Sequence, residues 1–201
     1  LFYLKREREE RAAGRGSEAA LEAAAATSGR AILVSGLTVI AALLGIAIAG
    51  AMWWAYFKHE GSDEVVGGGQ AFVWGYGHYF VFTAVAATGA GLHVAASYIE
   101  DQAHIGGVAT VLSVAVPVGG FVLMVYALHT WLVREADPFH LSLLAGTAAV
   151  LVAAVWLAAA GVPMAWCLLV VTLAPAVTVV GYEAVGHRHL AAILNRSLSR
   201  D

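Results

Sequence analysis

The sequence predicts an all-α fold, a polytopic integral membrane bundle of about five transmembrane helices. Hydrophobic residues make up 60% of the 201 residues and charged residues only 12%, and the mean hydropathy is +0.76. Soluble domains carry about a quarter charged residues. The charges also gather in a few short stretches, chiefly 5–30, 58–64, 134–137 and 183–201. A soluble fold of this length could not bury the apolar surface that lies between these stretches.

The first apolar run covers residues 31–57 and contains no charged side chain. A hydrocarbon core of about 30 Å needs about 20 apolar helical residues, so this run is long enough to cross a membrane. It ends in an aromatic cluster of Trp53, Trp54, Tyr56 and Phe57. Because Trp and Tyr gather at membrane–water interfaces, we interpret the cluster as an interface belt. An aromatic ligand box is the alternative interpretation.

The second and third runs cover residues 71–99 and 108–133. The second is rich in glycine and alanine, which lets helices approach closely in lipid. The third contains Pro117, which removes one hydrogen bond from the helix. We therefore expect a kink there, with the freed carbonyl satisfied by a neighbouring helix or by water.

The fourth and fifth runs cover residues 141–160 and 164–182 and are separated only by Gly161-Val162-Pro163. So short a connection predicts an antiparallel helical hairpin. Strands are excluded because the runs are continuously apolar, whereas strands of a membrane barrel alternate between apolar and polar residues.

The first 50 residues resemble a transporter family. The segment 1–11 reads LFYLKREREER, residues 19–23 read AALEA, and residues 27–39 read TSGRAILVSGLTV. These segments are similar to the connection between the fourth and fifth helices of the mycobacterial membrane protein large (MMPL) transporters, relatives of the resistance-nodulation-division (RND) exporters. In that family the proton-coupling Asp-Tyr pair precedes this connection, so the resemblance brings no proton relay to this chain.

Residues 51–201 resemble a second family. The aromatic run WWAYF at 53–57, the run YGHYF at 76–80 and the run AATG at 86–89, followed by His93, are similar to the C-terminal half of the bacterial low temperature requirement A (LtrA) family. The resemblance implies a membrane-helix module but supplies neither a mechanism nor a catalytic residue. We therefore divide the chain into a charged, cytoplasmic MMPL-like segment at 1–30, a first transmembrane helix at 31–57 that spans the join, and an LtrA-like four-helix module at 58–201.

The basic residues support opposite topologies for the two parts. The N-terminal segment is predicted to be cytoplasmic because it is rich in basic residues: Lys5, Arg6, Arg8, Arg11, Arg15 and Arg30. Five spans then leave the C-terminal tail outside, although it carries Arg188, Arg196 and Arg200. We hypothesise that the sequence is a fusion or a truncated chain. Sequencing the genomic locus across the codons for residues 50–53 tests this, and one uninterrupted reading frame would identify a natural fusion.

Two histidines are the candidates for an intramembrane polar site. His78 and His93 are fifteen residues apart on the second span, about 60° apart around a helix, so both could face the bundle interior. Ionisable groups inside spans often form a proton or substrate relay, or bind a metal. The alternative is a pair of neutral histidines bonded to nearby carbonyl or hydroxyl groups. His129, close to the end of the third span, is interpreted as an ordinary helix-end residue.

No enzymatic constellation is found in the sequence. Neither a Ser-His-Asp order, nor zinc-type Cys/His spacing, nor a pair of carboxylates occurs, so we expect no catalytic residue, cofactor or metal ligand. The single cysteine, Cys167, lies in an apolar run and is interpreted as a small buried residue. The basic residues sit in the loops, which excludes nucleic acid as a partner.

The leading hypothesis is a multi-pass protein of the bacterial inner membrane that transports or handles a small molecule or a lipid. One alternative is a structural or interaction module that acts by helix packing, and another is a fragment of a proton-driven MMPL/RND exporter. The expected partners are the lipid bilayer and either a second copy of the chain or another membrane protein.

Overall fold

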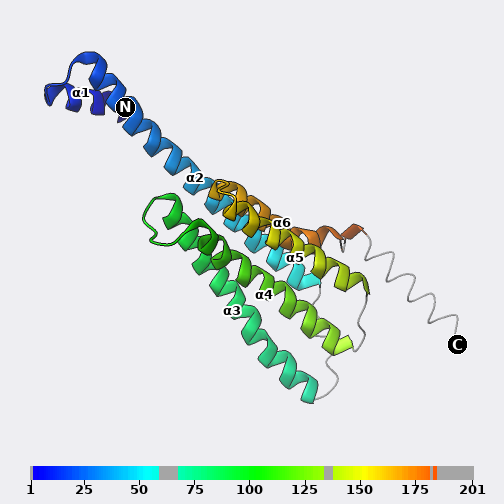
Figure 1. Ribbon diagram of the computed structural model, residues 1–201. Coiled ribbons are helices and arrows are strands. Elements are labelled where there is room, and N and C mark those ends of the chain that lie inside the picture. Colours follow the sequence, from blue (N-terminus) through cyan, green and yellow to red (C-terminus); the bar gives the residue numbers. More distant parts are fainter. Residues whose placement is uncertain (1, 59–67, 134–137, 182, 185–201) are drawn as a thin grey trace.

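The computed structural model describes residues 2–58, 68–133, 138–181 and 183–184. These residues form an all-helical structure without strands, which confirms the predicted fold class (Figure 1). The helices are α1 (Phe2–Ala12), α2 (Ser17–Lys58), α3 (Gly68–Ile99), α4 (Gly107–Val133), α5 (Pro138–Ala159) and α6 (Met164–Gly181). The charged C-terminal tail, the acidic loop after α2 and the segment 134–137 lie outside the described residues.

Five of the helices are long and apolar enough to cross a membrane, as the apolar runs predict. The qualifying segments are Ser17–Phe57, Gly68–Ile99, Gly107–Leu132, Pro138–Ala159 and Met164–Gly181. The first of them is longer than predicted, because α2 is one unbroken helix of 42 residues that includes part of the charged N-terminal segment. The chain is therefore a multi-pass membrane protein.

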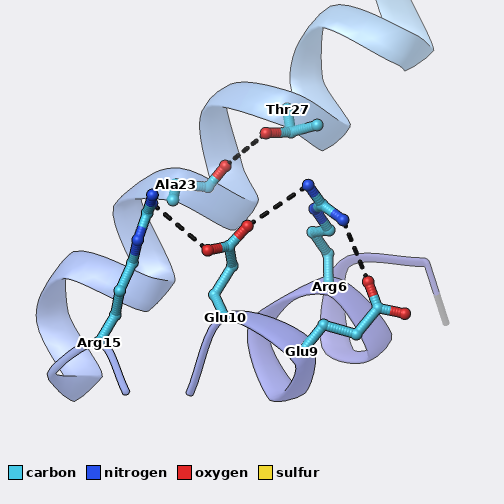
Figure 2. A network of polar contacts seen from close by, with 6 residues as sticks. All are labelled: Arg6, Glu9, Glu10, Arg15, Ala23 and Thr27. Atoms are coloured by element: carbon cyan, nitrogen blue, oxygen red, sulfur yellow. Dashed lines mark hydrogen bonds and ion pairs between the residues drawn. The ribbon is translucent and has the colours of Figure 1, made fainter. Parts of the chain in front are cut away.

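The charged N-terminal segment forms a helical hairpin that projects beyond the bundle (Figure 1). The chain turns at Gly14, whose φ of +86° is readily adopted by glycine. Ala20 and Ala24 are fully buried where α1 packs on α2. Figure 2 shows the ion pairs that Glu10 forms with Arg6 and Arg15, at N···O distances of 3.4 Å and 3.3 Å. The two arginine side chains are 46% and 55% exposed, and ion pairs so open to solvent contribute at most about 1 kcal/mol each, so the hairpin depends mainly on the packing of small residues.

The five long helices share one apolar core. α3 lies along α4, α5 along α6, and α2 packs against both α6 and α3. Phe121, Ile48 and Leu168 are among the largest fully buried side chains of this core. Many large apolar side chains remain exposed, as is required of helices whose surroundings are lipid.

The short connection between α5 and α6 is the predicted antiparallel hairpin. Gly161 adopts a φ of +79°. Its N–H donates to the carbonyl of Ala158 at 3.1 Å, and the N–H of Val162 donates to the carbonyl of Leu157 at 3.0 Å. This bonding pattern ends a helix with a left-handed residue, usually glycine. The hairpin therefore follows from local sequence alone.

Pro117 has no N–H, so the carbonyl of Ser113, one turn earlier, lacks its helical hydrogen-bond partner. This carbonyl lies against α3. Ser113 packs on Gly91, and its hydroxyl donates to the Gly91 carbonyl at 3.4 Å. A neighbouring helix thus covers the freed carbonyl, and its predicted hydrogen-bond partner stays a prediction. α4 continues as a single helix through the proline.

Candidate functional site

Aromatic and histidine side chains gather at one end of the bundle, where α2 and α4 end and α3 and α5 begin. The predicted interface belt lies here. Trp53, Trp54 and Phe57 have exposed side chains, as residues of an interface belt require. Tyr56 differs from them because it is half-buried and turned toward α3.

His78 of α3 is held between two hydrogen-bonding partners. Its Nδ1 lies 2.6 Å from the carbonyl oxygen of Trp74, one helical turn earlier, and its Nε2 lies 2.8 Å from the hydroxyl oxygen of Tyr56. A carbonyl oxygen can only accept, so Nδ1 carries the hydrogen. In the neutral ring Nε2 is then an acceptor, and the Tyr56 hydroxyl donates to it. The tautomer of His78 is thus fixed by its own helix.

A cleft of about 760 Å³ lies beside this pair, between α2, α3 and α4. Tyr56 and Phe57 line one end of it and Gly45 lines the part that lies further into the span. Most of the remaining lining is apolar, with Val81, Phe82 and Phe121 among its residues. Eleven residues of helix separate Gly45 from Tyr56, which corresponds to about 17 Å along α2.

Three residues of the cleft lining have a polar N or O atom in the side chain: Tyr56, Trp53 and Thr88. The hydroxyl of Thr88 is committed to its own helix, because it donates to the carbonyl of Ala84 at 2.8 Å and is buried. The other two polar residues of the lining, Tyr56 and Trp53, lie at the same end of the cleft.

His93 does not share a site with His78. Its side chain is exposed and lines a separate groove of about 380 Å³ between α2 and α3, with Thr38, Ala41 and Ala42. The two histidines are about 22 Å apart along α3. The helix therefore places His78 toward α2 inside the bundle and His93 at the outer surface.

Sequence reasoning missed a second histidine cluster at the same end of the bundle as His78. The rings of His129 in α4 and His140 in α5 lie 5.3 Å apart in an edge-to-face arrangement, and the Tyr126 ring is 5.4 Å from His140. His140 lies in the first turn of α5, which begins at Pro138. Because α4 and α5 are consecutive helices, their pairing would have indicated that His140 lies near His129. In the part of the chain that the structure describes, no three His, Cys, Asp or Glu side chains are grouped to hold a metal.

Two curated relatives match a short segment of the chain. The mycolic acid-containing lipids exporter MmpL11 of Mycolicibacterium smegmatis is 59% identical over 46 residues, which cover 23% of this chain and 5% of the exporter. The probable transport protein MmpL11 of Mycobacterium leprae is 56% identical over 46 residues, covering 23% of this chain and 4% of that protein. The chain thus spans only a small part of these relatives. No solved structure matches.

A family match covers most of the chain. Residues 18–175, from the first turn of α2 into α6, match the family described as bacterial low temperature requirement A protein. The match includes residues 18–50 as well as the part that follows. The chain therefore belongs to the bacterial low temperature requirement A (LtrA) protein family.

Proposed function

We propose that this protein binds the acyl chain of a membrane lipid in the cleft between α2, α3 and α4, and that it handles lipids in the bacterial inner membrane. The observation that carries the proposal is the shape of the cleft: it is apolar along its length and polar at one end. Lipids have the same division between tail and head. Ligand sites in proteins typically occupy about 300–1,000 Å³, and the cleft lies within that range.

The position of the cleft in the span supports a lipid in particular. Tyr56 and Phe57 lie at the end of the apolar part of α2, just before Lys58, where the interface is expected. From there the cleft extends about 17 Å to Gly45, roughly half of a 30 Å hydrocarbon core. A tail from one leaflet has about this reach. Phe82, 66% exposed, lines the cleft at the bundle surface, where a tail enters from the bilayer.

The matched segment of the Mycolicibacterium smegmatis relative, whose name describes the export of lipids, adds support for a role in lipid movement. We further propose that the activity is binding or transport and not catalysis. In support, the polar groups of the cleft are two aromatic side chains and one threonine bonded within its own helix.

Photo-crosslinking tests the cleft. The protein is reconstituted in vesicles that contain a phospholipid with a diazirine in the middle of one acyl chain, irradiated, and analysed by peptide mass spectrometry. We expect labelling of α2 between Gly45 and Phe57 and of α3 between Val81 and Leu92. Gly89→Leu fills the cleft at a position where a Cβ meets no atom within 4 Å, and should reduce the labelling severalfold.

Gly75→Leu is the matched control. Gly75 lies on the same helix, a Cβ there also meets nothing within 4 Å, and the residue does not line the cleft. The labelling should be the same as in the wild type. If Gly89→Leu and Gly75→Leu are both labelled as strongly as the wild type, the acyl chain does not occupy the cleft and the proposal is wrong.

A second candidate function, helix packing against a partner, is favoured by the groove that contains His93. Its α2 side consists mainly of small residues such as Ala41, Ala42 and Ala49, which permit close approach of another helix in lipid. The partner would be a second copy of the chain or another membrane protein. His93→Ala separates this function from a proton relay. Unchanged lipid transport in the folded variant would exclude the relay. Reduced association with Ala42→Leu, measured by energy transfer in vesicles, would support packing.

A further inference from the structure

We infer that Leu92 of α3 closes the inner end of the cleft and so sets the length of the acyl chain that the protein accepts, limiting it to tails that stay within one leaflet. This inference rests on the proposed function, because it concerns the chain that the same cleft would hold. It follows from the position of Leu92 between the cleft and the groove that contains His93.

The cleft and the groove meet at three residues. Gly45, Ala49 and Leu92 line both of them. Glycine has no side chain and alanine has only a methyl group, so of the three only Leu92 has a side chain large enough to separate the two spaces. Beyond this junction the groove continues along the same two helices, to Thr38 on α2 and Ala96 on α3.

Leu92 closes the junction by direct contact with α2. Its Cδ1 lies 3.0 Å, and its Cδ2 3.7 Å, from the point that a Cβ on residue 45 would occupy. Both methyl groups therefore lie against Gly45, which is itself buried. Atoms packed at van der Waals distance leave no passage for a methylene chain. Because the closure depends on the terminal carbons of one side chain, shortening that side chain should open it.

The closure lies near the middle of the bilayer. Gly45 is about 17 Å from Tyr56 along α2, and Leu92 is about the same distance from Val81 along α3. Half of the hydrocarbon core is about 15 Å. With Leu92 in place the cleft therefore takes a tail that belongs to one leaflet. Without it, the combined path from Tyr56 to Thr38 would extend about 27 Å along α2, nearly across the core.

Photo-crosslinking with two tail lengths tests the inference. The probes are phosphatidylcholines in vesicles that carry a diazirine at the end of a myristoyl chain or of the much longer lignoceroyl chain. Both tails lie in hydrocarbon whether or not they are bound, so the readout is the position of the label and not the affinity. The measured quantity is labelling of the groove, at residues 38–42 and 93–96. In the wild type we expect only background from the bulk lipid, which Gly89→Leu should leave unchanged.

Leu92→Ala removes the carbons that lie against Gly45. Labelling of the groove by the lignoceroyl probe should rise severalfold, whereas the myristoyl probe, which is too short to pass the junction, should show no rise. Adding Gly89→Leu to Leu92→Ala should return the labelling to background, because the tail reaches the groove through the cleft.

Two further variants complete the set. Leu92→Val has a side chain of intermediate size and should give a smaller rise, which keeps the test available if the alanine variant does not fold. Leu43→Ala is the matched control. Leu43 is exposed on α2 and lines neither the cleft nor the groove, so its substitution should leave the labelling at the wild-type level.

The outcomes separate the two proposals. If groove labelling stays at background in Leu92→Ala and Leu92→Val while the mid-chain probe still labels the cleft, Leu92 does not set the chain length and lipid binding stands. If the lignoceroyl probe already labels the groove of the wild type and Gly89→Leu abolishes that labelling, the path past Leu92 is open and the inference is wrong. If no probe labels the cleft, the lipid-binding function is overturned, and the inference with it.

Discussion

Arg30 of α2 forms an ion pair with Asp101, which lies two residues after the end of α3 at Ile99. Glu100 extends the contact, since its Oε1 lies 3.5 Å from the Thr38 hydroxyl on α2. The pair joins residues that are 71 positions apart in the chain. It places the start of the apolar part of α2 and the end of α3 at the same surface of the bundle, so the two helices are antiparallel.

This arrangement predicts the sidedness of the loops. Cysteines at Ala26 and Gln102, introduced in a Cys167→Ala background, should react with a membrane-impermeant maleimide from the same face of the membrane. A cysteine at Gly69, at the opposite end of α3, should react only from the other face. The check is labelling of intact and of inverted vesicles. Ala160→Cys, in the α5–α6 turn, should react from the same face as the cysteines at positions 26 and 102. If it reacts from the face of the Gly69 cysteine instead, the number of spans between Gln102 and Ala160 is wrong.

Asp101 also has an unusual backbone, with a φ of +57°. Its N–H donates to the carbonyl of Tyr98 at 3.2 Å, and the N–H of Gln102 donates to the carbonyl of Ser97 at 2.9 Å. Asp101 therefore occupies the position at which helices usually end in glycine. The left-handed conformation costs an L-residue about 1–2 kcal/mol. We expect Asp101→Gly to match or exceed the wild type in thermal stability, and Asp101→Ala to be less stable by about 1 kcal/mol.

Asp101→Asn separates the backbone from the charge. Asparagine tolerates the left-handed conformation but cannot pair with Arg30 as an ion. Both side chains of the pair are about 70% exposed, and such pairs contribute about 0–1 kcal/mol. The midpoint of thermal unfolding in detergent should therefore fall only slightly. A fall in Asp101→Asn as large as that in Asp101→Ala would assign the stability to the ion pair and not to the helix end.

Gly91 of α3 is required by the backbone of α4. A Cβ at this position would lie 2.1 Å from the Ser113 carbonyl oxygen and 2.6 Å from its carbon, and backbone atoms cannot move aside as a flexible side chain can. We expect Gly91→Ala to separate the two helices and to lower stability by about 1–3 kcal/mol. Gly89→Ala, two residues away, meets nothing within 4 Å and should be neutral. Equal unfolding midpoints for the two variants would contradict the close packing.

Much of the fold is readable from the sequence, because each element depends on local chemistry. The five apolar runs, the turn at Gly161 and the freed carbonyl before Pro117 need only lengths, turn residues and a missing N–H. The contacts of the candidate site depend instead on how each helix is rotated and shifted along its neighbour. Periodicity places His78 and His93 about 60° apart, but the packing of α2 decides that Tyr56 meets the first and that the second stays exposed. The pairing of His129 with His140 could not be predicted from the sequence for the same reason.

Thr147 of α5 provides a buried polar link to α6 whose strength can be measured. Its hydroxyl donates to the carbonyl of Ala174 at 3.3 Å and lies 3.4 Å from the hydroxyl of Thr178, and both threonine side chains are buried. Thr147→Val keeps the shape and removes the donor, and hydrogen bonds between membrane helices contribute about 0.6 kcal/mol, at most about 1.7. We expect a loss of that size in the free energy of unfolding. Thr83→Val, which removes an exposed bond within one helix, should cost less because it leaves the contact between helices unchanged.

In a double-mutant cycle, Thr147→Val and Thr178→Val should couple. Strict additivity of their effects would mean that the two hydroxyls do not interact and that only the bond to Ala174 links the helices.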